Sequence, residues 1–273
     1  MSITSQTHHI PTPDGQLFAQ VWVPDLAQGS PLVLLHDSLG CVALWRDFPQ
    51  KLAAATGRTV IAYDRLGFGN SAAHPSELAL SFVADEAQQG FAQVLRYFGL
   101  ETFVVLGHSV GGGMAICCAA HYPQACQGLV TIAAQTFVED RTIAGIRSAQ
   151  QQFAQPGGME RLAKYHGTKA SWVLRAWTHT WLSSRFAHWR LDGVLPQVCC
   201  PTLAIHGALD EYGSNTHPQM IASTVQGPAS LEILPGCGHI PHKEQTAHCV
   251  ALIAAHLNQE NNKKTLKRLS NKR

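Results

Sequence analysis

The sequence has few charged residues and no long apolar run. Charged side chains occupy 14% of the 273 positions and hydrophobic ones 45%, as in ordinary soluble globular proteins. A helix that crosses a bilayer needs about 20 consecutive apolar residues, and no run in this chain approaches that length. The first nine residues are polar and lack the apolar core of a secretory signal. These absences predict a cytoplasmic protein without a membrane partner.

Motifs that bind metal are also missing. The eight cysteines form no C-x-x-C pair, and the chain has no H-E-x-x-H. Cys237, His239 and His242 lie close together in sequence, but no second pair of ligands stands at a recognisable spacing. Several cysteines lie within apolar runs, where a thiol behaves as a small hydrophobe. We therefore expect reduced thiols, no metal and no cofactor.

Positive charge is scarce outside the C-terminus. Six of the 20 basic residues fall in the last eleven positions, which leaves 14 basic against 18 acidic residues, a net charge of −4, for the rest. That balance argues against a nucleic-acid partner. We expect residues 261–273 to form a basic, disordered tail.

The most informative stretch runs from Thr102 to Met114. Its apolar, β-forming residues lead directly into Gly-His-Ser-Val-Gly at 107–111, and small or apolar residues follow at helical spacing. A strand, a sharp turn and a helix with a serine at the apex form a nucleophile elbow. Glycines two positions either side of the serine let the strand and the helix pass close together. The pattern predicts that Ser109 is a nucleophile.

Apolar runs alternate with amphipathic stretches along most of the chain, which predicts an α/β fold. Around 139–195 the alternation stops, and short helices there carry four of the six tryptophans. We expect a mostly parallel central sheet with helices on both faces, formed by residues 1–134 and 196–260, and a helical insert at 135–195. Expected strands include 31–36, 58–64, 103–106, 128–133, 201–206 and 230–234, and expected helices include 44–56, 82–98, 219–225 and 245–257.

A serine nucleophile needs a base and an acid that orients the base. In a parallel sheet the active groups gather at the carboxyl ends of the strands. Asp210 and His239 each follow one of the last two expected strands, and the order serine, aspartate, histidine suits this architecture. We predict His239 as the base of Ser109 and Asp210 as the acid, with Glu211 and Glu139 as lesser candidates for the acid.

An oxyanion formed at Ser109 would need two hydrogen-bond donors. One is predicted to be the backbone N–H of Val110, directly after the nucleophile, and the other the N–H of Ser38 in the loop after the 31–36 strand. His36 is expected to brace that loop by hydrogen bonds. The glycine-punctuated loop 64–71 is expected to be a structural turn.

These features together resemble the α/β-hydrolase superfamily over nearly the whole chain. The matching motifs lie at 36–40, 64–71, 107–111, 207–210 and 238–239. The resemblance implies that the helical insert is a cap over the site, and it is strongest toward small bacterial hydrolases of the esterase, lactonase and carbon-carbon-bond hydrolase type. A serine nucleophile argues against haloalkane dehalogenases and epoxide hydrolases, which use aspartate at that position.

One position departs from the family pattern. Many members have glycine after the oxyanion-loop histidine, whereas this chain has Asp37. A carboxylate aimed at the oxyanion would oppose its charge, so we expect Asp37 to turn away and bond the loop backbone. The residues expected to line a substrate pocket are Trp177, Trp181, His108 and Asp37.

The predicted activity is hydrolysis of a small carboxylic ester, or a related acyl bond, through an acyl-enzyme. The same triad would also serve a lactonase, a carbon-carbon-bond hydrolase, a cofactor-free perhydrolase or a ligand receptor that has kept the fold. The expected partner is a small acyl substrate, and the sequence leaves a homodimer open.

Overall fold

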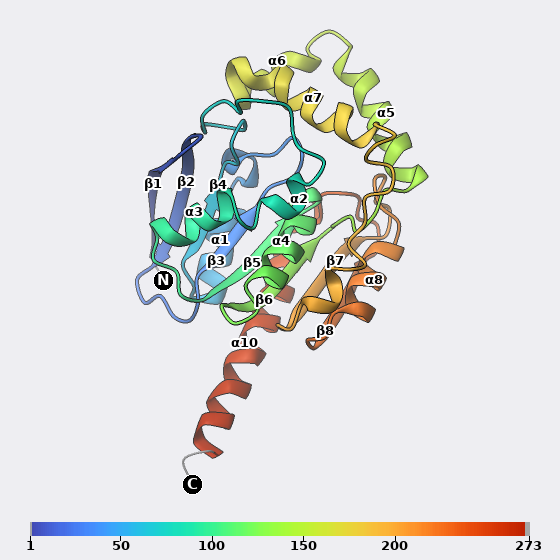
Figure 1. Cartoon of the computed structure of the whole chain (residues 1–273). Helices are drawn as coiled ribbons and strands as arrows, with labels where there is room; N and C mark the ends of the chain where they lie inside the picture. Colours follow the sequence, from blue (N-terminus) through green and yellow to red (C-terminus); the bar gives the residue numbers. More distant parts are fainter. Residues whose placement is uncertain (1, 271–273) are drawn as a thin grey trace.

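A computed structural model describes residues 2–270 of the chain (Figure 1). One mixed sheet forms its centre, with the strand order β1-β2-β4-β3-β5-β6-β7-β8. β2 pairs antiparallel with β1 and β4, and the remaining neighbours pair parallel. The mostly parallel sheet predicted from the apolar runs is confirmed. The strands are β1 (Ile3–Thr12), β2 (Gly15–Pro24), β3 (Leu32–Leu35), β4 (Val60–Tyr63), β5 (Phe103–His108), β6 (Cys126–Ile132), β7 (Thr202–Gly207) and β8 (Ala229–Leu234).

Helices cover both faces of the sheet, because alternate strand residues supply two separate apolar cores. In β5, Phe103 and Val105 belong to one core and Val104 and Leu106 to the other. The first core includes residues of α2 (Phe82–Asp85), α3 (Gly90–Tyr97), α4 (Val110–His121) and α8 (Thr216–Thr224). The second includes residues of α1 (Phe48–Thr56), α10 (Thr246–Ser270) and the short helix η1 (Val42–Trp45). Two further short helices are η3 (Leu195–Gln197), whose Leu195 belongs to the first core, and α9 (Pro241–Glu244).

Three further helices are inserted between β6 and β7 and lie together at one end of the sheet (Figure 1). They fall within the insert expected at 135–195, and we call them the cap. An apolar cluster of Leu162, Ala170 and Val173 ties the cap helices to Phe68, in the loop after β4. The cap helices are α5 (Asp140–Phe153), α6 (Gly158–His166) and α7 (Ala170–Trp181), with the 3-10 turn η2 (Gly167–Lys169) between the last two.

His166, the last residue of α6, also joins the cap to the core. Its Nδ1 accepts the N–H of Gly69 at 2.9 Å, and its Nε2 donates to the carbonyl of Leu39 at 3.0 Å. Burial is the main reason that the pKa of His166 lies below its usual value, so the neutral ring is favoured. One cap side chain thus holds the loop after β3 and the loop after β4 together.

The loop after β4 has the structural role expected for residues 64–71. Asp64 is buried, and its two carboxylate oxygens accept the N–H of Val42 at 2.6 Å and of Asn70 at 2.7 Å. Ser71 Oγ donates to the Asp64 carbonyl and accepts the N–H of Phe18. Burial raises the pKa of Asp64 to about 6. The Asp64 carboxylate therefore holds Asn70, within this loop, close to Val42 at the start of η1.

Two helices expected to be continuous are interrupted in the structure. The single helix expected at 82–98 is divided into α2 and α3, and Gln89 before α3 has φ −102° and ψ −103°, outside the helical region. The helix expected at 44–56 begins only at Phe48, since η1 precedes it and Pro49 suits the first turn of a new helix. Amphipathic spacing alone did not reveal either interruption.

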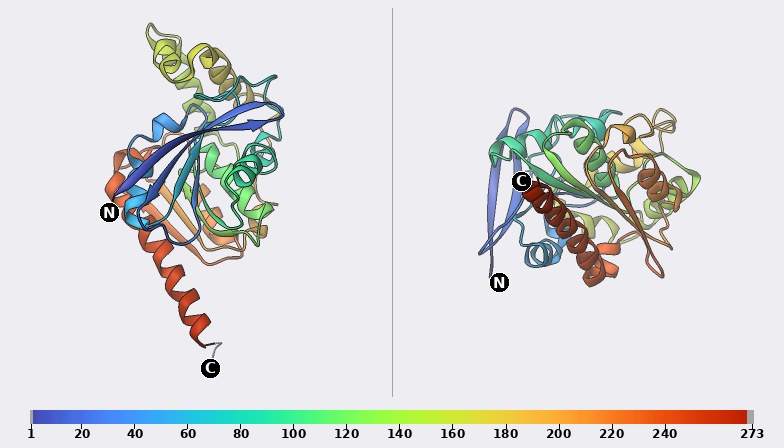
Figure 2. Two further views of the ribbon diagram at one scale, coloured as in Figure 1. Left: turned by 90° about the vertical axis from the view of Figure 1, so that its left-hand side faces the viewer. Right: turned by 90° about the horizontal axis from the view of Figure 1, so that it is seen from below.

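The last helix is longer than expected. Residues 261–270, which were expected to be disordered, continue α10 to Ser270, and 271–273 lie outside the described residues. No glycine or proline interrupts the chain between Thr246 and Ser270, so nothing local ends the helix. Figure 2 shows α10 leaving the body on the side opposite the cap. Across the part of the chain that the structure describes, no helix is long and apolar enough to cross a membrane.

Candidate active site

Ser109 sits on the turn between β5 and α4 with φ 56° and ψ −125°, a strained conformation for a residue with a side chain. A Cβ on Gly107 would meet the carbonyl oxygen of Gly111 at 1.9 Å, and a Cβ on Gly111 would meet that of Leu35 at 2.3 Å. Only glycine fits at either place, and the close approach is what holds the turn sharp. The sequence therefore presents the serine at the carboxyl end of β5, as the elbow motif predicts.

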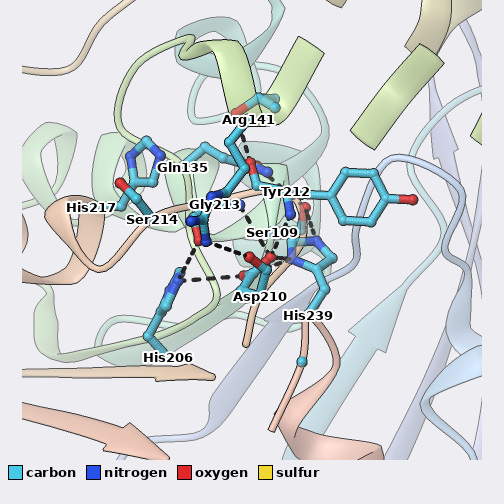
Figure 3. Close-up of polar contacts among 12 residues, drawn as sticks. Ser109, Gln135, Arg141, His206, Asp210, Tyr212, Gly213, Ser214, His217 and His239 are labelled. Atoms are coloured by element: carbon cyan, nitrogen blue, oxygen red, sulfur yellow. Dashed lines mark hydrogen bonds and ion pairs between the residues drawn. The ribbon is translucent and has the colours of Figure 1, made fainter. Parts of the chain in front are cut away.

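The structure brings Ser109, His239 and Asp210 together from three separate segments (Figure 3). His239 Nε2 lies 3.0 Å from Ser109 Oγ, and His239 Nδ1 lies 2.9 Å and 2.8 Å from the two carboxylate oxygens of Asp210. Asp210 follows β7 and His239 follows β8, so two parallel strands deliver them to the same edge of the sheet. An acceptor-only carboxylate requires a proton on Nδ1, which leaves Nε2 free to take the serine proton.

The charges within this group fit a base and its orienting acid. Burial opposes the positive form of His239, but the hydrogen bond and charge of Asp210 outweigh it and raise the pKa of His239 above its usual value. Burial likewise opposes the Asp210 carboxylate, and the hydrogen bond and charge of His239, with the charge of His206, still lower its pKa. Asp210 therefore stays ionised and stabilises an imidazolium at His239.

The loop that carries Asp210 is held by the cap and by its own backbone (Figure 3). Asp210 Oδ1 accepts the N–H groups of Tyr212 at 2.8 Å and Gly213 at 3.1 Å. From the start of α5, Arg141 donates to the Asp210 carbonyl at 2.9 Å, and Thr142 donates to the Tyr212 carbonyl at 2.6 Å. The position of the acid therefore depends on the cap as well as on the sheet.

The two lesser candidates for the acid are engaged elsewhere or exposed. Glu139 accepts the N–H of Ser214 at 2.6 Å and bonds the His217 ring at 3.1 Å, away from His239. Glu211 is exposed, and its neighbour Asp210 makes the contact with His239. Of the three carboxylates considered from sequence, the geometry selects Asp210.

The two backbone donors expected for an oxyanion share a small void of about 10 Å³, room for roughly one water-sized group. Ser38 and Val110 both line it, and it shares Ser38, Trp177 and Trp181 with the larger cavity at Ser109. Within residues 2–270, neither the N–H of Ser38 nor that of Val110 has a hydrogen-bond acceptor. Both N–H groups are therefore free of a protein acceptor within the described residues, as an oxyanion hole requires, although Ser109 itself lines the larger cavity and not this void.

The cavity at Ser109 encloses about 240 Å³ under the cap. Its walls combine aromatic and aliphatic side chains with a few polar groups, which is the usual character of a small-molecule site. All four residues expected to line a substrate pocket do line it. The lining residues are Asp37, Ser38, Leu39, Leu44, His108, Ser109, Gln135, Thr142, Ile146, Trp177, Trp181, Tyr212, His239, Ile240 and Lys243.

Asp37 behaves only partly as expected. Its Oδ1 accepts the N–H of Leu39 at 2.9 Å, so it does bond the loop backbone. It does not turn away from the cavity, however, because its Oδ2 lies 3.2 Å from Nδ1 of His108. Burial opposes the charge on Asp37, but the hydrogen bond and charge of His108 hold its pKa well below the usual range. A neighbouring histidine, which the sequence did not reveal as the partner, balances the carboxylate.

Gln135 is a site residue that the sequence reasoning missed. It is buried after β6, and its Oε1 lies 3.3 Å from Ser109 Oγ. Its position just past the carboxyl end of a strand was the one available signal. Tyr212 was also missed, and its ring lies 4.7 Å from that of His239. Both residues restrict how a substrate can approach the serine.

The described residues contain no group of three or more histidine, cysteine, aspartate or glutamate side chains arranged to hold a metal ion. All eight cysteines lie within the described chain, none forms a disulfide, and seven are buried. Burial raises the pKa of Cys117 and Cys249 to about 12, so these thiols stay protonated.

Residues 30–157 match the family model described as the alpha/beta hydrolase fold. A proline iminopeptidase of Lactobacillus delbrueckii subsp. bulgaricus is 28% identical over 48% of this chain and 43% of its own length. The chain thus matches less than half of that relative. The human serine hydrolase BPHL is 27% identical over 67% of this chain and 64% of its own length.

A solved structure shares the fold across almost the entire chain. It is the 2-hydroxy-6-oxo-6-phenylhexa-2,4-dienoate hydrolase from Rhodococcus sp. strain RHA1, with a TM-score of 0.75 and 17% sequence identity. The alignment covers 94% of this chain and 100% of that one. At this identity the likeness concerns the fold alone.

Proposed function

We propose that this chain, a member of the α/β-hydrolase superfamily, is a serine hydrolase that cleaves a small carboxylic ester. The observation that carries the proposal is the continuous contact from Ser109 through His239 to Asp210, with distances of 3.0 Å and 2.8 Å. An incidental serine would not need a base at hydrogen-bond distance and a buried acid behind that base.

The reaction would proceed in two halves. Ser109 Oγ attacks the substrate carbonyl while His239 takes its proton, and the N–H groups of Ser38 and Val110 receive the oxyanion. His239 then gives the proton to the leaving alcohol, which departs as the acyl-enzyme forms. In the second half His239 activates water, which attacks the acyl-enzyme and releases the acid and the free serine.

The cavity supports a small and largely apolar acyl group. Ile146, Trp177 and Trp181 line it from the cap, and its volume of about 240 Å³ limits what can lie beside the serine. A peptidase that binds a free amino terminus would need an acidic group for the ammonium. Among described residues Asp37 is the one lining carboxylate, and Leu39 N–H and His108 already engage its oxygens. Ester substrates therefore suit the cavity better than peptides.

The proposal is tested with p-nitrophenyl esters of graded acyl length and with aminoacyl p-nitroanilides. Ser109→Ala should lower turnover of the preferred ester by at least about a thousandfold while the protein stays folded. Ser223→Ala, which removes an exposed hydroxyl on α8, is the matched control. Wild-type turnover in the Ser109→Ala protein, or selective turnover of the anilides, would contradict the proposal.

A second candidate is hydrolysis of a carbon-carbon bond in a ketone that carries a carboxylate. Lys243 favours it, because this amine lines the cavity and its side chain forms no hydrogen bond or ion pair with other described residues. An ammonium there could bind a substrate carboxylate. Lys243→Met should then raise KM for carboxylate-bearing substrates without changing KM for neutral esters. Equal effects on both kinds of substrate would remove the support for this candidate.

A further inference from the structure

Arg65 is buried beneath the active site, and no carboxylate of the described chain lies within ion-pair distance of it. It follows β4 and is 4% exposed, and its guanidinium lies over the ring of Phe68 at 4.2 Å. It forms no ion pair with any carboxylate of the described chain, and its Nε has no hydrogen-bond partner there. Burial lowers the pKa of Arg65 and outweighs the charges of Glu86 and Asp37, which favour the protonated guanidinium. A buried guanidinium in this position depends on its hydrogen bonds.

The polar contacts of Arg65 form a closed ring with the loop after β3. The backbone N–H of Arg65 donates to His36 Nε2 at 3.1 Å, which makes Nε2 an acceptor and places the ring proton on Nδ1. That Nδ1 donates to the carbonyl of Asp37 at 2.8 Å, and Nη2 of Arg65 donates to the same carbonyl at 3.1 Å. Burial and the charge of Arg65 lower the pKa of His36 well below its usual value, which keeps this tautomer neutral.

The carbonyl of Asp37 and the N–H of Ser38 belong to one peptide unit. The described chain contains no cis peptide bond, so the two groups point in opposite directions. The carbonyl accepts from His36, from Arg65 and, at 3.2 Å, from the N–H of Gly40. Among the residues of the described chain, the N–H on the other side has no acceptor, and Ser38 lines the small void together with Val110 and Arg65.

We propose that Arg65 is a positioning residue for the oxyanion hole: with His36 it fixes and polarises the peptide unit between Asp37 and Ser38. This inference rests on the proposed serine-hydrolase function. Donors on the carbonyl side hold the peptide plane in place before the reaction, so little reorganisation is needed when the oxyanion forms. They also draw electron density from the N–H, which strengthens it as a donor. Arg65 also lines the small void beside Ser38 and Val110, so its positive charge lies near the two expected donors.

The test measures oxyanion stabilisation separately from binding. A trifluoromethyl ketone forms a bond from its carbonyl carbon to Ser109 Oγ, its carbonyl electron pair becomes the alkoxide, and the serine proton moves to His239. The matching methyl ketone has the same shape but adds poorly, so it reports ordinary binding. Both inhibition constants, with kcat and KM for the preferred ester, are compared between wild type and Arg65→Met. Arg96→Met, at an exposed arginine whose side chain donates to Gln93, is the matched control.

We expect Arg65→Met to lower kcat by about 10- to 100-fold, less than the loss of a direct oxyanion donor. The inhibition constant of the trifluoromethyl ketone should rise by a similar factor, while KM and methyl-ketone binding stay within about threefold. Arg65→Gln, which keeps a neutral donor, should lie between Arg65→Met and wild type. If Arg65→Met does not fold, the same ratio of the two inhibition constants is read from Arg65→Gln and Arg65→Lys.

The outcomes separate this inference from the proposed function. A wild type that neither turns over esters nor binds the trifluoromethyl ketone would contradict the proposed function itself. An active wild type whose Arg65 variants keep an unchanged ratio of the two inhibition constants would contradict only the role of Arg65. If the Arg65 variants bind both ketones more weakly by the same factor, Arg65 supports the site as a whole and not the oxyanion hole in particular. That result would also overturn the inference.

Discussion

Oδ2 of Asp37 lies 3.2 Å from Nδ1 of His108, in the same cavity as the hydroxyl of Ser109. The other ring nitrogen of His108 lies 2.8 Å from the carbonyl oxygen of His239. Both neighbours of the ring are acceptors, so the His108 side chain is held between the Asp37 carboxylate and the loop that carries His239. Burial opposes the charge on Asp37, but the contact with His108 lowers the pKa of Asp37 and engages a carboxylate that would otherwise oppose an oxyanion at Ser109.

The Asp37–His108 contact predicts strong coupling between the two side chains. His108→Asn should lower kcat/KM about tenfold, because the Asp37 carboxylate is left unbalanced near the oxyanion, and 1.4 kcal/mol is enough for that factor. In an Asp37→Asn background the same change should cost much less. Kinetics of the wild type, the two single variants and the double variant provide the cycle, and losses that simply add would rule the coupling out.

The raised pKa of His239 predicts the acidic limb of the pH profile. His239 must be neutral to act as a base, so kcat/KM should rise as pH increases through a pKa above the ordinary value of about 6.5. Asp210→Asn removes the hydrogen bond and charge that raise this pKa, so the limb should move to lower pH while kcat falls steeply. A limb that stays in place in Asp210→Asn would show that Asp210 does not set the charge of His239.

The same shift also has a consequence for stability. A histidine with a folded-state pKa above its unfolded value stabilises the fold most below the unfolded pKa, and loses that contribution as pH rises through the folded pKa. Asp210→Asn should therefore reduce the free energy of unfolding more at pH 6 than at pH 9. Chemical denaturation at the two pH values measures the difference.

Alanine substitutions at two tryptophans of the cap should have different effects, one on stability and the other on substrate preference. Trp181 is 2% exposed and packs edge-on against Phe186 and Trp189, so Trp181→Ala should destabilise the protein by about 3–5 kcal/mol. Trp177 is half-buried beside Tyr212, so Trp177→Ala should mainly widen the cavity and shift the preference toward longer acyl groups. Thermal unfolding and the ester panel measure both. An unchanged chain-length preference in Trp177→Ala would remove Trp177 from the substrate site.

We predict that the contacts of His166 between the cap and the core weaken at low pH. Its lowered pKa means that the unfolded chain takes up a proton more readily than the folded one. The stabilisation is therefore complete above the unfolded pKa of about 6.5 and is lost as pH falls from there through the folded pKa. Protonation of Nδ1 would also remove the acceptor for Gly69 N–H.

Hydrogen exchange in α6 and α7 measures this loosening directly. The protection factors, which correct for the intrinsic pH dependence of exchange, should fall below pH 6 in the wild type and much less in His166→Gln, because a glutamine amide can donate and accept without titrating. His179→Gln, a change at an exposed histidine on α7, is the control. Equal acid sensitivity in His166→Gln would show that another group controls the cap.

Much of the fold and of the candidate site followed from sequence, because both depend on local patterns. Buried parallel strands appear as continuous apolar runs such as 31–36, and an elbow needs glycines at fixed offsets from Ser109. The order of Asp210 and His239 after successive strands placed them at the same edge of the sheet.

The contacts that tune the site depend on side chains far apart in the chain. Nothing in the spacing links Asp37 to His108 across 71 positions, or His166 to Gly69 across 97. Nothing in the amphipathic spacing marks the non-helical backbone of Gln89 between α2 and α3. Such contacts are set by how the elements pack, so local pattern could not predict them.

The central claim is that Ser109 is an activated nucleophile, and intact-protein mass spectrometry after a fluorophosphonate probe tests it most directly. The protein is labelled as wild type, as Ser109→Ala and as the control Ser223→Ala. We expect one covalent adduct on wild type and on Ser223→Ala, and none on Ser109→Ala. A wild type that stays unlabelled, or an adduct that persists in Ser109→Ala, would contradict the account.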